Sequence, residues 1–279
     1  MHISELEKKA IEIRKSIFQI IHQGKTGHTG SDLSCTDILV ALYYQVMKVD
    51  ANNPLLDNRD QYVQSKGHAV EVLWAILADK GFIDKTELET FSKFKSRLIG
   101  HPNNKVSGVE MNTGSLGHGL PVSVGIALAG KMDKKSYHTY TLMGDGELAE
   151  GSVWEGAMAA ANYKLDNLTA IIDRNGLQIT GQSEDVMSVE PLADKWRAFG
   201  WDVHSVAGND ISALVDVLSA PNKPDHPKLI IANTIKGKGF SEAENQVTWH
   251  HRVPTDEQLS HAFLELDQQM EALNYDGEK

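Results

Sequence analysis

The sequence has a single cysteine, no cluster of basic residues and no apolar run long enough to cross a membrane. One cysteine, Cys35, excludes an internal disulfide and is typical of a reducing compartment. The net charge of -11, with scattered lysines and arginines, argues against nucleic acid as a partner. The first residues lack the apolar core of a signal peptide. We therefore expect a cytoplasmic protein that does not associate with a membrane, and we expect Cys35 to be a small core residue.

The composition is otherwise that of a globular protein with a large core, since 41% of 279 residues are hydrophobic. Segments with helical apolar spacing alternate with short apolar segments typical of strands. This alternation predicts an α/β fold with a doubly wound, mostly parallel sheet flanked by helices. There is no internal repeat, low-complexity tract or linker, so residues 1–279 are expected to form a single domain.

The boundaries of the expected elements follow from capping residues, glycines and apolar spacing. Helices are expected at 4–23, 35–48, 69–79, 121–130, 151–163, 191–199 and 211–219, and from 255 onward. Strands are expected at 58–65, 138–143, 168–172, 201–206 and 228–232. Capping boxes are predicted for the first helix, Ser4 to Glu7, and for the last, Thr255 to Gln258.

The central segment runs strand, helix, strand, and each of its two strands ends in a polar turn. Gly144, Asp145 and Gly146 follow the first strand, and Asn175 follows the second, 30 positions after Asp145. Strands joined by a helical crossover are parallel, so both strand ends open on the edge of the sheet where α/β proteins bind ligands. Asp145 and Asn175 are therefore expected to be neighbours.

A carboxylate, an amide oxygen and a backbone carbonyl together suit a hard divalent cation such as Mg2+ that also binds phosphate oxygens. An aspartate beside a diphosphate would repel it unless a metal intervened. The alternative is that Gly144 to Gly146 form only a turn.

Three further loops place a histidine next to glycine. His28 lies between Gly27 and Gly30, His68 follows Gly67, and His101 follows Gly100. His68 is expected at a helix N-terminus, which favours the neutral imidazole. A single loop histidine is more often a surface or structural residue. The repeated glycine-flanked setting favours a shared role.

Other segments leave alternatives open. The loop 112–119 enters a helix of small residues, which suits a ligand at free backbone groups or close packing on the sheet. Lys236 and Lys238 follow a predicted strand and are either phosphate contacts or solvated. A nucleotide phosphate loop is excluded at Gly24, because the glycine that the motif requires five positions earlier is absent.

With these residues assembled, the chain resembles the thiamine diphosphate enzymes and, along nearly all its length, the N-terminal part of transketolase. The signature of the thiamine diphosphate enzymes is Gly-Asp-Gly with an asparagine about thirty residues later, which Asp145 and Asn175 match. The motifs of transketolase occur in the same order in this chain and surround His28, His68, His101, Gly114 and His250. A dinucleotide enzyme is a weaker match, since position 149 is alanine.

The resemblance implies thiamine diphosphate and Mg2+ as cofactors and assigns roles by matching positions. The metal on the diphosphate would be held by Asp145, Asn175 and the carbonyl of Leu177. The cofactor would be contacted by His68, Gly114, Leu116, Gly146, Asn175 and His250. Ketose hydroxyls would be bound and protons moved by His28, His68, His101 and His250. His250 is preferred over His251 because it directly follows Trp249, and Glu150 matches an interface glutamate.

Two positions depart from the family pattern. Asp32 stands close to His28, where the family has no acid, and is expected to change which donor or acceptor is accepted. Ser115 and His118 stand where full-length transketolases tend to have proline and glutamine, a pattern nearer the separately encoded N-terminal subunits.

The resemblance stops at the first domain of transketolase. Full-length members continue into a pyrimidine-binding domain, which supplies the glutamate that activates the cofactor. The implied protein is the N-terminal subunit of a split transketolase, which acts on sugar phosphates when paired with a C-terminal subunit, as α2β2. Alternatives are a specialised pathway for a branched or modified sugar phosphate, half of a deoxyxylulose-phosphate synthase or ketoacid dehydrogenase, and a cofactor-free regulatory subunit.

Overall fold

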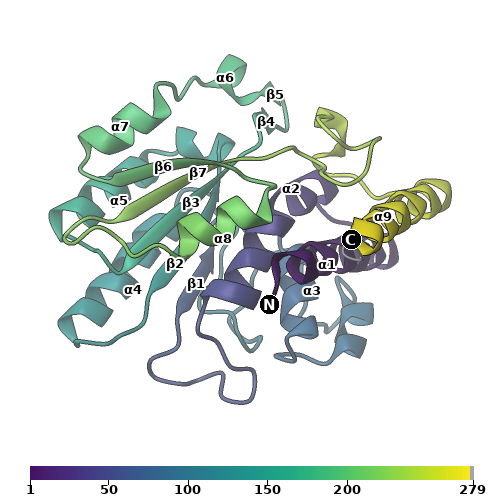
Figure 1. Ribbon diagram of the computed structural model, residues 1–279, viewed down its shortest axis with the longest axis horizontal. Coiled ribbons are helices and arrows are strands. Elements are labelled where there is room, and N and C mark those ends of the chain that lie inside the picture. Colours follow the sequence, from purple (N-terminus) through teal and green to yellow (C-terminus); the bar gives the residue numbers. More distant parts are fainter. Residues whose placement is uncertain (277–279) are drawn as a thin grey trace.

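The computed structural model describes residues 1–276 and contains a five-stranded sheet with helices on both faces (Figure 1). All neighbouring strands of this sheet are parallel. Their spatial order is β1 (Gln61–Gln64), β2 (Thr139–Gly144), β3 (Leu168–Arg174), β7 (Lys228–Asn233) and β6 (Asp202–Ala207). The predicted doubly wound α/β fold is confirmed. A two-stranded antiparallel hairpin, which was not predicted, joins β4 (Leu177–Gln178) to β5 (Gly181–Gln182).

The two faces of the sheet bury different apolar residues. In β3, Ile171 belongs to one core, whereas Ala170 and Ile172 belong to the other. Side chains of a strand alternate between faces, so a strand covered on both sides must be apolar throughout. The first core contains helices α1 (Ile3–Gly24), α2 (Thr29–Ala41), α3 (Glu71–Asp79), α8 (Ile211–Ser219) and α9 (Asp256–Asp276). The second contains α4 (Gly119–Met132), α5 (Gly151–Asn162) and α7 (Leu192–Ala198).

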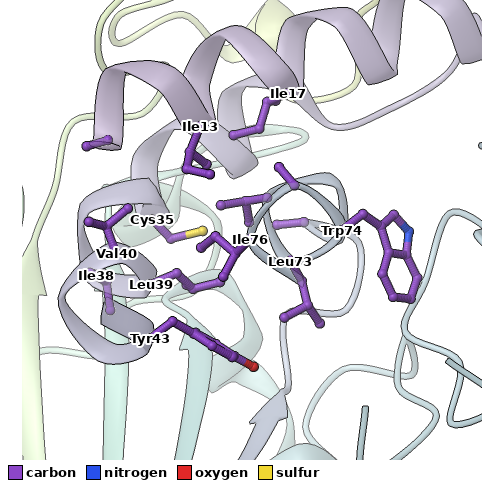
Figure 2. Close-up of a cluster of buried hydrophobic side chains, with 14 of the residues drawn as sticks. Ile13, Ile17, Cys35, Ile38, Leu39, Val40, Tyr43, Leu73, Trp74 and Ile76 are labelled. Atoms are coloured by element: carbon purple, nitrogen blue, oxygen red, sulfur yellow. The ribbon is translucent and has the colours of Figure 1, made fainter. Parts of the chain in front are cut away.

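Helix α2 lies inside the first core. All its residues are buried, and Figure 2 shows Cys35 and Leu39 of α2 beside Ile13 of α1 and Ile76 of α3. A helix buried on every side needs no polar face, which is why α2 lacks an amphipathic pattern. The prediction that Cys35 is a core residue is confirmed, since its side chain is buried.

The start of α2 was predicted wrongly. The helix begins at Thr29, six residues before the expected start at Cys35, and His28 is its N-cap residue. It ends at Ala41 and continues as a π-helical turn, Leu42–Val46. Thr, Gly, Ser and Asp favour helices poorly, but burial against the segment around Trp249 overrides that preference. A Cβ on Gly30 would lie 2.7 Å from the Trp249 carbonyl oxygen.

The remaining differences concern helix ends. The first capping box is formed by His2 and Glu5, so its assignment to Ser4 and Glu7 was wrong. The last one is confirmed, because Thr255 and Gln258 each accept a hydrogen bond from the other's backbone N–H. His68 lies three residues before α3, so its expected place at the helix N-terminus was wrong by about one turn. Short 3-10 helices were not predicted at Lys85–Thr90, Gly146–Ala149 and Val247–Trp249.

In the part of the chain that the structure describes, no helix combines the length and the hydropathy of a membrane span.

Candidate active site

The carboxyl ends of β1, β2, β3 and β7 border one cavity of about 470 Å3. It lies where the parallel strands of such a sheet are expected to bind ligands. Most of the residues predicted to bind the cofactor, metal or sugar line it, namely His28, His68, Gly114, Leu116, Asp145, Gly146, Asn175, Leu177 and His250. His101 and Glu150 do not line it.

One corner of the cavity is made of oxygen atoms from the ends of β2 and β3. Gly144 pairs with Asp173 in the sheet, which brings Asp145 beside the turn that contains Asn175. The Asp145 carboxylate accepts hydrogen bonds from the backbone N–H of Gly146 at 2.7 Å and of Gly176 at 2.6 Å. The predicted proximity of the two turns is confirmed.

The charge of Asp145 is only partly balanced within the chain. The Arg174 guanidinium lies 3.2 Å from its carboxylate. Burial and the nearby Asp173 carboxylate nevertheless raise the pKa of Asp145 above its usual value. A buried carboxylate with a raised pKa gains from an added cation.

A lysine ammonium reaches the same corner. Lys236 Nζ donates to the Leu177 carbonyl at 2.9 Å and lies 2.9 Å from His250 Nδ1. Lys236 is buried, and burial together with Lys66 lowers its pKa to about 8. Lys238 instead is partly exposed and pairs with Glu244. Of the two lysines, Lys236 is therefore the one placed to meet a phosphate.

The donor set of this corner fits Mg2+. Asp145, the Asn175 amide and the Leu177 carbonyl are hard oxygen ligands, which a magnesium ion supplements with phosphate oxygens and water. Within residues 1–276 there is no group of three or more His, Cys, Asp or Glu side chains suited to a metal. A softer metal such as zinc would require such a group.

Three histidines, His28, His68 and His250, form a second wall of the cavity, and His251 packs against His28 from outside it. The ring centroid of His28 lies 5.1 Å from that of His68, 5.6 Å from that of His250 and 4.6 Å from that of His251. The rings of His68 and His250 stack at 5.3 Å. These residues come from three separate segments, so only the tertiary fold brings them together.

The buried histidines of this wall are held in the neutral form. Burial lowers the pKa of His28 and of His250 to about 3, and nearby positive charges, including Lys236, add to the effect. Burial likewise lowers the pKa of His68 well below its usual value. A neutral imidazole has one donor and one acceptor nitrogen, so each ring offers both functions near neutral pH.

His101 contributes from the rim. A Cβ on Gly114 would lie 2.6 Å from the His101 ring, so these two residues are in direct contact. Gly114 also has φ +138°, a conformation that favours glycine. Burial lowers the pKa of His101. The glycine-rich loop therefore permits the histidine to approach the backbone that lines the cavity.

His251 and Glu150 lie outside the cavity. The His251 side chain is exposed and reaches Thr26 at 3.5 Å, so His250 is the one of the pair that lines the cavity. Glu150 is exposed at the start of α5. Its predicted interface role stays a prediction.

Two cavity residues were missed in the sequence. Glu147 is buried and accepts hydrogen bonds from Ser65 and from the backbone N–H groups of Gly117 and Gly144, which ties three loops together. Lys66 is buried and forms an ion pair with Asp173. Charged residues are seldom fully buried, and neither of these two was given a role from the sequence.

A parallel α/β sheet with a cation-binding oxygen corner, a buried lysine and a wall of neutral histidines defines a protein that binds a phosphorylated cofactor beside a polar substrate. Comparison with known proteins identifies the family. The family described as "Transketolase, thiamine diphosphate binding domain" matches residues 6–263. The chain belongs to this family.

Two relatives that match along nearly the whole chain are named as transketolase subunits. One subunit of the "Apulose-4-phosphate transketolase" of Phocaeicola vulgatus is 48% identical over 98% of both chains. "6-deoxy-6-sulfo-D-fructose transketolase subunit SqwG" of Clostridium sp. (strain MSTE9) is 40% identical over 95% of this chain and 97% of that one.

A solved structure of a longer transketolase matches this chain over part of its own length. The transketolase from Campylobacter jejuni has a TM-score of 0.91 and 32% identity, and the match covers 96% of this chain but 43% of that one. The chain thus spans less than half the length of this transketolase. The predictions of a transketolase-family enzyme, of thiamine diphosphate as its cofactor and of a chain equivalent to the N-terminal subunit of a split transketolase are confirmed.

Proposed function

We propose that this chain, as a single domain, is the diphosphate-binding subunit of a two-subunit transketolase. The complex transfers a two-carbon ketol unit from a ketose phosphate donor to an aldose acceptor. The observation that carries the proposal is the oxygen corner beside a wall of neutral histidines in one cavity. A regulatory subunit without cofactor has no need to keep both sets of groups together.

The oxygen corner holds Mg2+ on the cofactor diphosphate. Asp145, Asn175 and the Leu177 carbonyl are the protein ligands, and Lys236 adds a positive charge for the phosphates. Gly146 lets its backbone approach the diphosphate side, since a Cβ there would lie 2.6 Å from Gln178. Gly114 and Leu116 contact the cofactor further along the cavity.

Thiamine diphosphate, when bound, supplies the carbanion chemistry that breaks and forms the carbon–carbon bond. The histidines bind and orient the sugar. Lys236 donates to Nδ1 of His250, which leaves the proton of that ring on Nε2. His28, His68 and His101 are likewise neutral and exchange hydrogen bonds with sugar hydroxyls. A proton leaves or returns at a ring nitrogen during transfer.

The second subunit completes the active site. Since the chain matches only 43% of a solved transketolase, the remaining binding groups are assigned to a C-terminal subunit with the pyrimidine-binding domain, in an α2β2 assembly. The exposed Glu150 lies at the interface that couples paired sites. The buried single cysteine supports a reducing compartment such as the cytoplasm.

The favoured substrates are phosphates of branched or otherwise modified sugars. Two relatives of this chain's length carry the names of modified sugars, apulose 4-phosphate and 6-deoxy-6-sulfo-D-fructose. Asp32, four residues after His28, departs from the usual motif, but its side chain is buried and does not line the cavity. Ordinary pentose phosphates are the second candidate, because the same histidines bind any ketose chain.

The test is reconstitution. Ketol transfer is measured with this chain by itself, with a candidate C-terminal partner by itself and with the two mixed, across a panel of ordinary and modified ketose phosphates. Activity only in the mixture, and dependent on thiamine diphosphate and Mg2+, is the expected result. Robust transfer by this chain without the partner would contradict the two-subunit proposal.

A further inference from the structure

Two carboxyl groups meet in the core behind the histidine wall. Asp32, in the first turn of α2, and Glu71, the first residue of α3, both have fully buried side chains. The two groups lie within hydrogen-bonding distance of each other. Figure 2 shows α2 and α3 packed side by side in this core. Neither residue has a place in the cofactor or metal site described above.

Three of the four carboxyl oxygens have no well-aligned donor outside the pair, while the backbone N–H groups of Val70 and Glu71 lie near them and favour the ionised forms. Asp32 Oδ1 accepts the Val72 backbone N–H at 2.9 Å. Asp32 Oδ2 and both oxygens of Glu71 receive no hydrogen bond from any other group in residues 1–276. Two ionised carboxylates in contact repel strongly when buried, whereas one shared proton gives a donor and an acceptor. The pair therefore carries a proton.

Few charged groups surround the pair. Lys66, which is shared with Asp173, favours the ionised form of Asp32, and the Cys35 thiol lies one turn along α2. On the α1 side the neighbour is apolar, since Ile21 and Glu71 pack together against Gly27. Burial and the Asp32 charge raise the pKa of Glu71 well above its usual value. The proton accordingly resides mainly on Glu71.

The pair connects α2, which His28 directly precedes, with α3, which begins three residues after His68. The Asp32 N–H donates to the His28 carbonyl at 3.0 Å, and a Cβ on Gly27 would lie 2.7 Å from Glu71 Oε1. Asp32 also binds the first turn of α3 through Val72, and His68 lies just ahead of that turn. A change in the pair thus moves one histidine relative to the other.

We propose that Asp32 and Glu71 are positioning residues that share one proton and thereby hold His28 and His68 at the spacing needed for ketol transfer. This inference rests on the proposed function for its kinetic consequences, but the shared proton does not. A hydrogen bond from a carboxyl group to a carboxylate is a directional contact, and here it lies in an otherwise apolar part of the core. It fixes the helix N-termini more closely than apolar packing alone.

The first experiment detects the proton. Infrared spectra of the wild-type complex, in deuterated buffer near neutral pH, are expected to show the carbonyl band of a protonated carboxyl group. The band should disappear in Glu71→Gln and persist in Glu110→Gln. Glu110 is a matched buried acid that pairs with Arg59 near the amino end of β1, away from the histidines. A wild-type spectrum without a band that depends on Glu71 overturns the shared proton, whatever the enzyme's activity.

The second experiment measures the positioning role in the reconstituted complex. Glu71→Gln keeps a donor for Asp32 without a titrating proton, so kcat should stay within about twofold of wild type, whereas Glu71→Leu should lower kcat about 10-fold, as losses of orienting groups do. The affinity for thiamine diphosphate should not change in either variant.

The pH profile separates positioning from general stability. The pKa of Glu71 lies well above its usual value, so the wild-type pair loses its proton only at alkaline pH. There the carboxylates repel and kcat should fall, whereas Glu71→Gln should lack this fall. If Glu71→Leu does not fold, the comparison of the pH profiles of wild type and Glu71→Gln still tests the positioning role. Equal kcat in wild type and Glu71→Leu, or identical alkaline profiles in wild type and Glu71→Gln, overturns the positioning role. Loss of transfer activity in the wild-type complex refutes the proposed function instead and leaves the infrared result intact.

Discussion

The oxygen corner and the histidine wall face the same cavity but are built in different ways. Asp145 and Asn175 belong to one strand, helix, strand unit, and their separation is set by a short crossover. The histidines come from segments as distant in sequence as His28 and His250, and they meet only after α1, α2 and β7 have packed. A local unit makes the proposed cation site, and long-range packing makes the proposed sugar site.

The two regions also differ in charge. The corner contains a buried carboxylate whose raised pKa shows that it lacks full compensation, so it favours a metal ion. Around His28, burial and the neighbouring cations together hold the rings neutral, so they act as hydrogen-bonding groups. Under the proposed function, the corner supplies affinity for the cofactor and the wall supplies turnover. Substitutions in the two regions should therefore change different quantities.

The largest effect is expected from Asp145→Ala. Loss of the only carboxylate in the proposed metal site should weaken binding of thiamine diphosphate with Mg2+ by about 100-fold or more, because even groups outside the ligand shell cost 10–100-fold. Calorimetric titration in the presence of the partner subunit measures it, and circular dichroism checks folding. Asp185→Ala, at an exposed acid 40 residues further along the chain, serves as control. Unchanged cofactor affinity in Asp145→Ala would refute the metal assignment.

His28→Ala should affect the opposite quantity. We expect kcat to fall about 100-fold, the lower range for loss of a proton-transfer group, while cofactor affinity changes only severalfold. Steady-state kinetics of the complex provides the measurement. His226→Ala, in the segment before the amino end of β7, should keep wild-type kcat. A loss of cofactor binding as large as that of Asp145→Ala would remove the distinction between the two regions.

Lys236→Met tests the residue that touches both regions. Removal of its positive charge should weaken cofactor affinity about 10-fold, which corresponds to one charge-assisted hydrogen bond. A smaller effect on kcat is expected through His250, which loses the donor at Nδ1. Calorimetry and kinetics on the same preparation separate the effects. Lys238→Met, at the more exposed lysine, should change neither.

The smallest effect concerns acid stability without cofactor. The folded-state pKa of His28 is lowered to about 3, so the unfolded chain takes up its proton first and the stabilisation is lost as the pH falls below about 6.5. His28→Asn should therefore lose less stability between pH 7 and pH 5, by on the order of 1 kcal/mol. Urea denaturation at both values measures it. Asp145, whose pKa is raised, instead makes the folded protein more stable as the pH falls, and it does so equally in both proteins. If the stability of wild type and of His28→Asn changes equally with pH, His28 is not held neutral.

The oxygen corner was predictable because its residues lie in one crossover, and strand pairing then leaves little freedom. The histidines were identifiable from family motifs, but nothing in the sequence indicated their ring distances. The start of α2 was missed, since Thr29 to Asp32 favour helices poorly and only burial makes them helical. Glu147 was missed for a related reason, because three loops supply its donors.

The sequence by itself determined the alternation of strands and helices, the family, the cofactor and the pair Asp145 and Asn175, because apolar periodicity and short-range motifs are written along the chain. Only the tertiary structure decided which lysine enters the cavity and that Asp32 meets Glu71. These outcomes depend on how α2, α3 and the segment after β7 pack against one another. Packing removes water from the groups it encloses, and it is the removal of water that sets their charge and their partners.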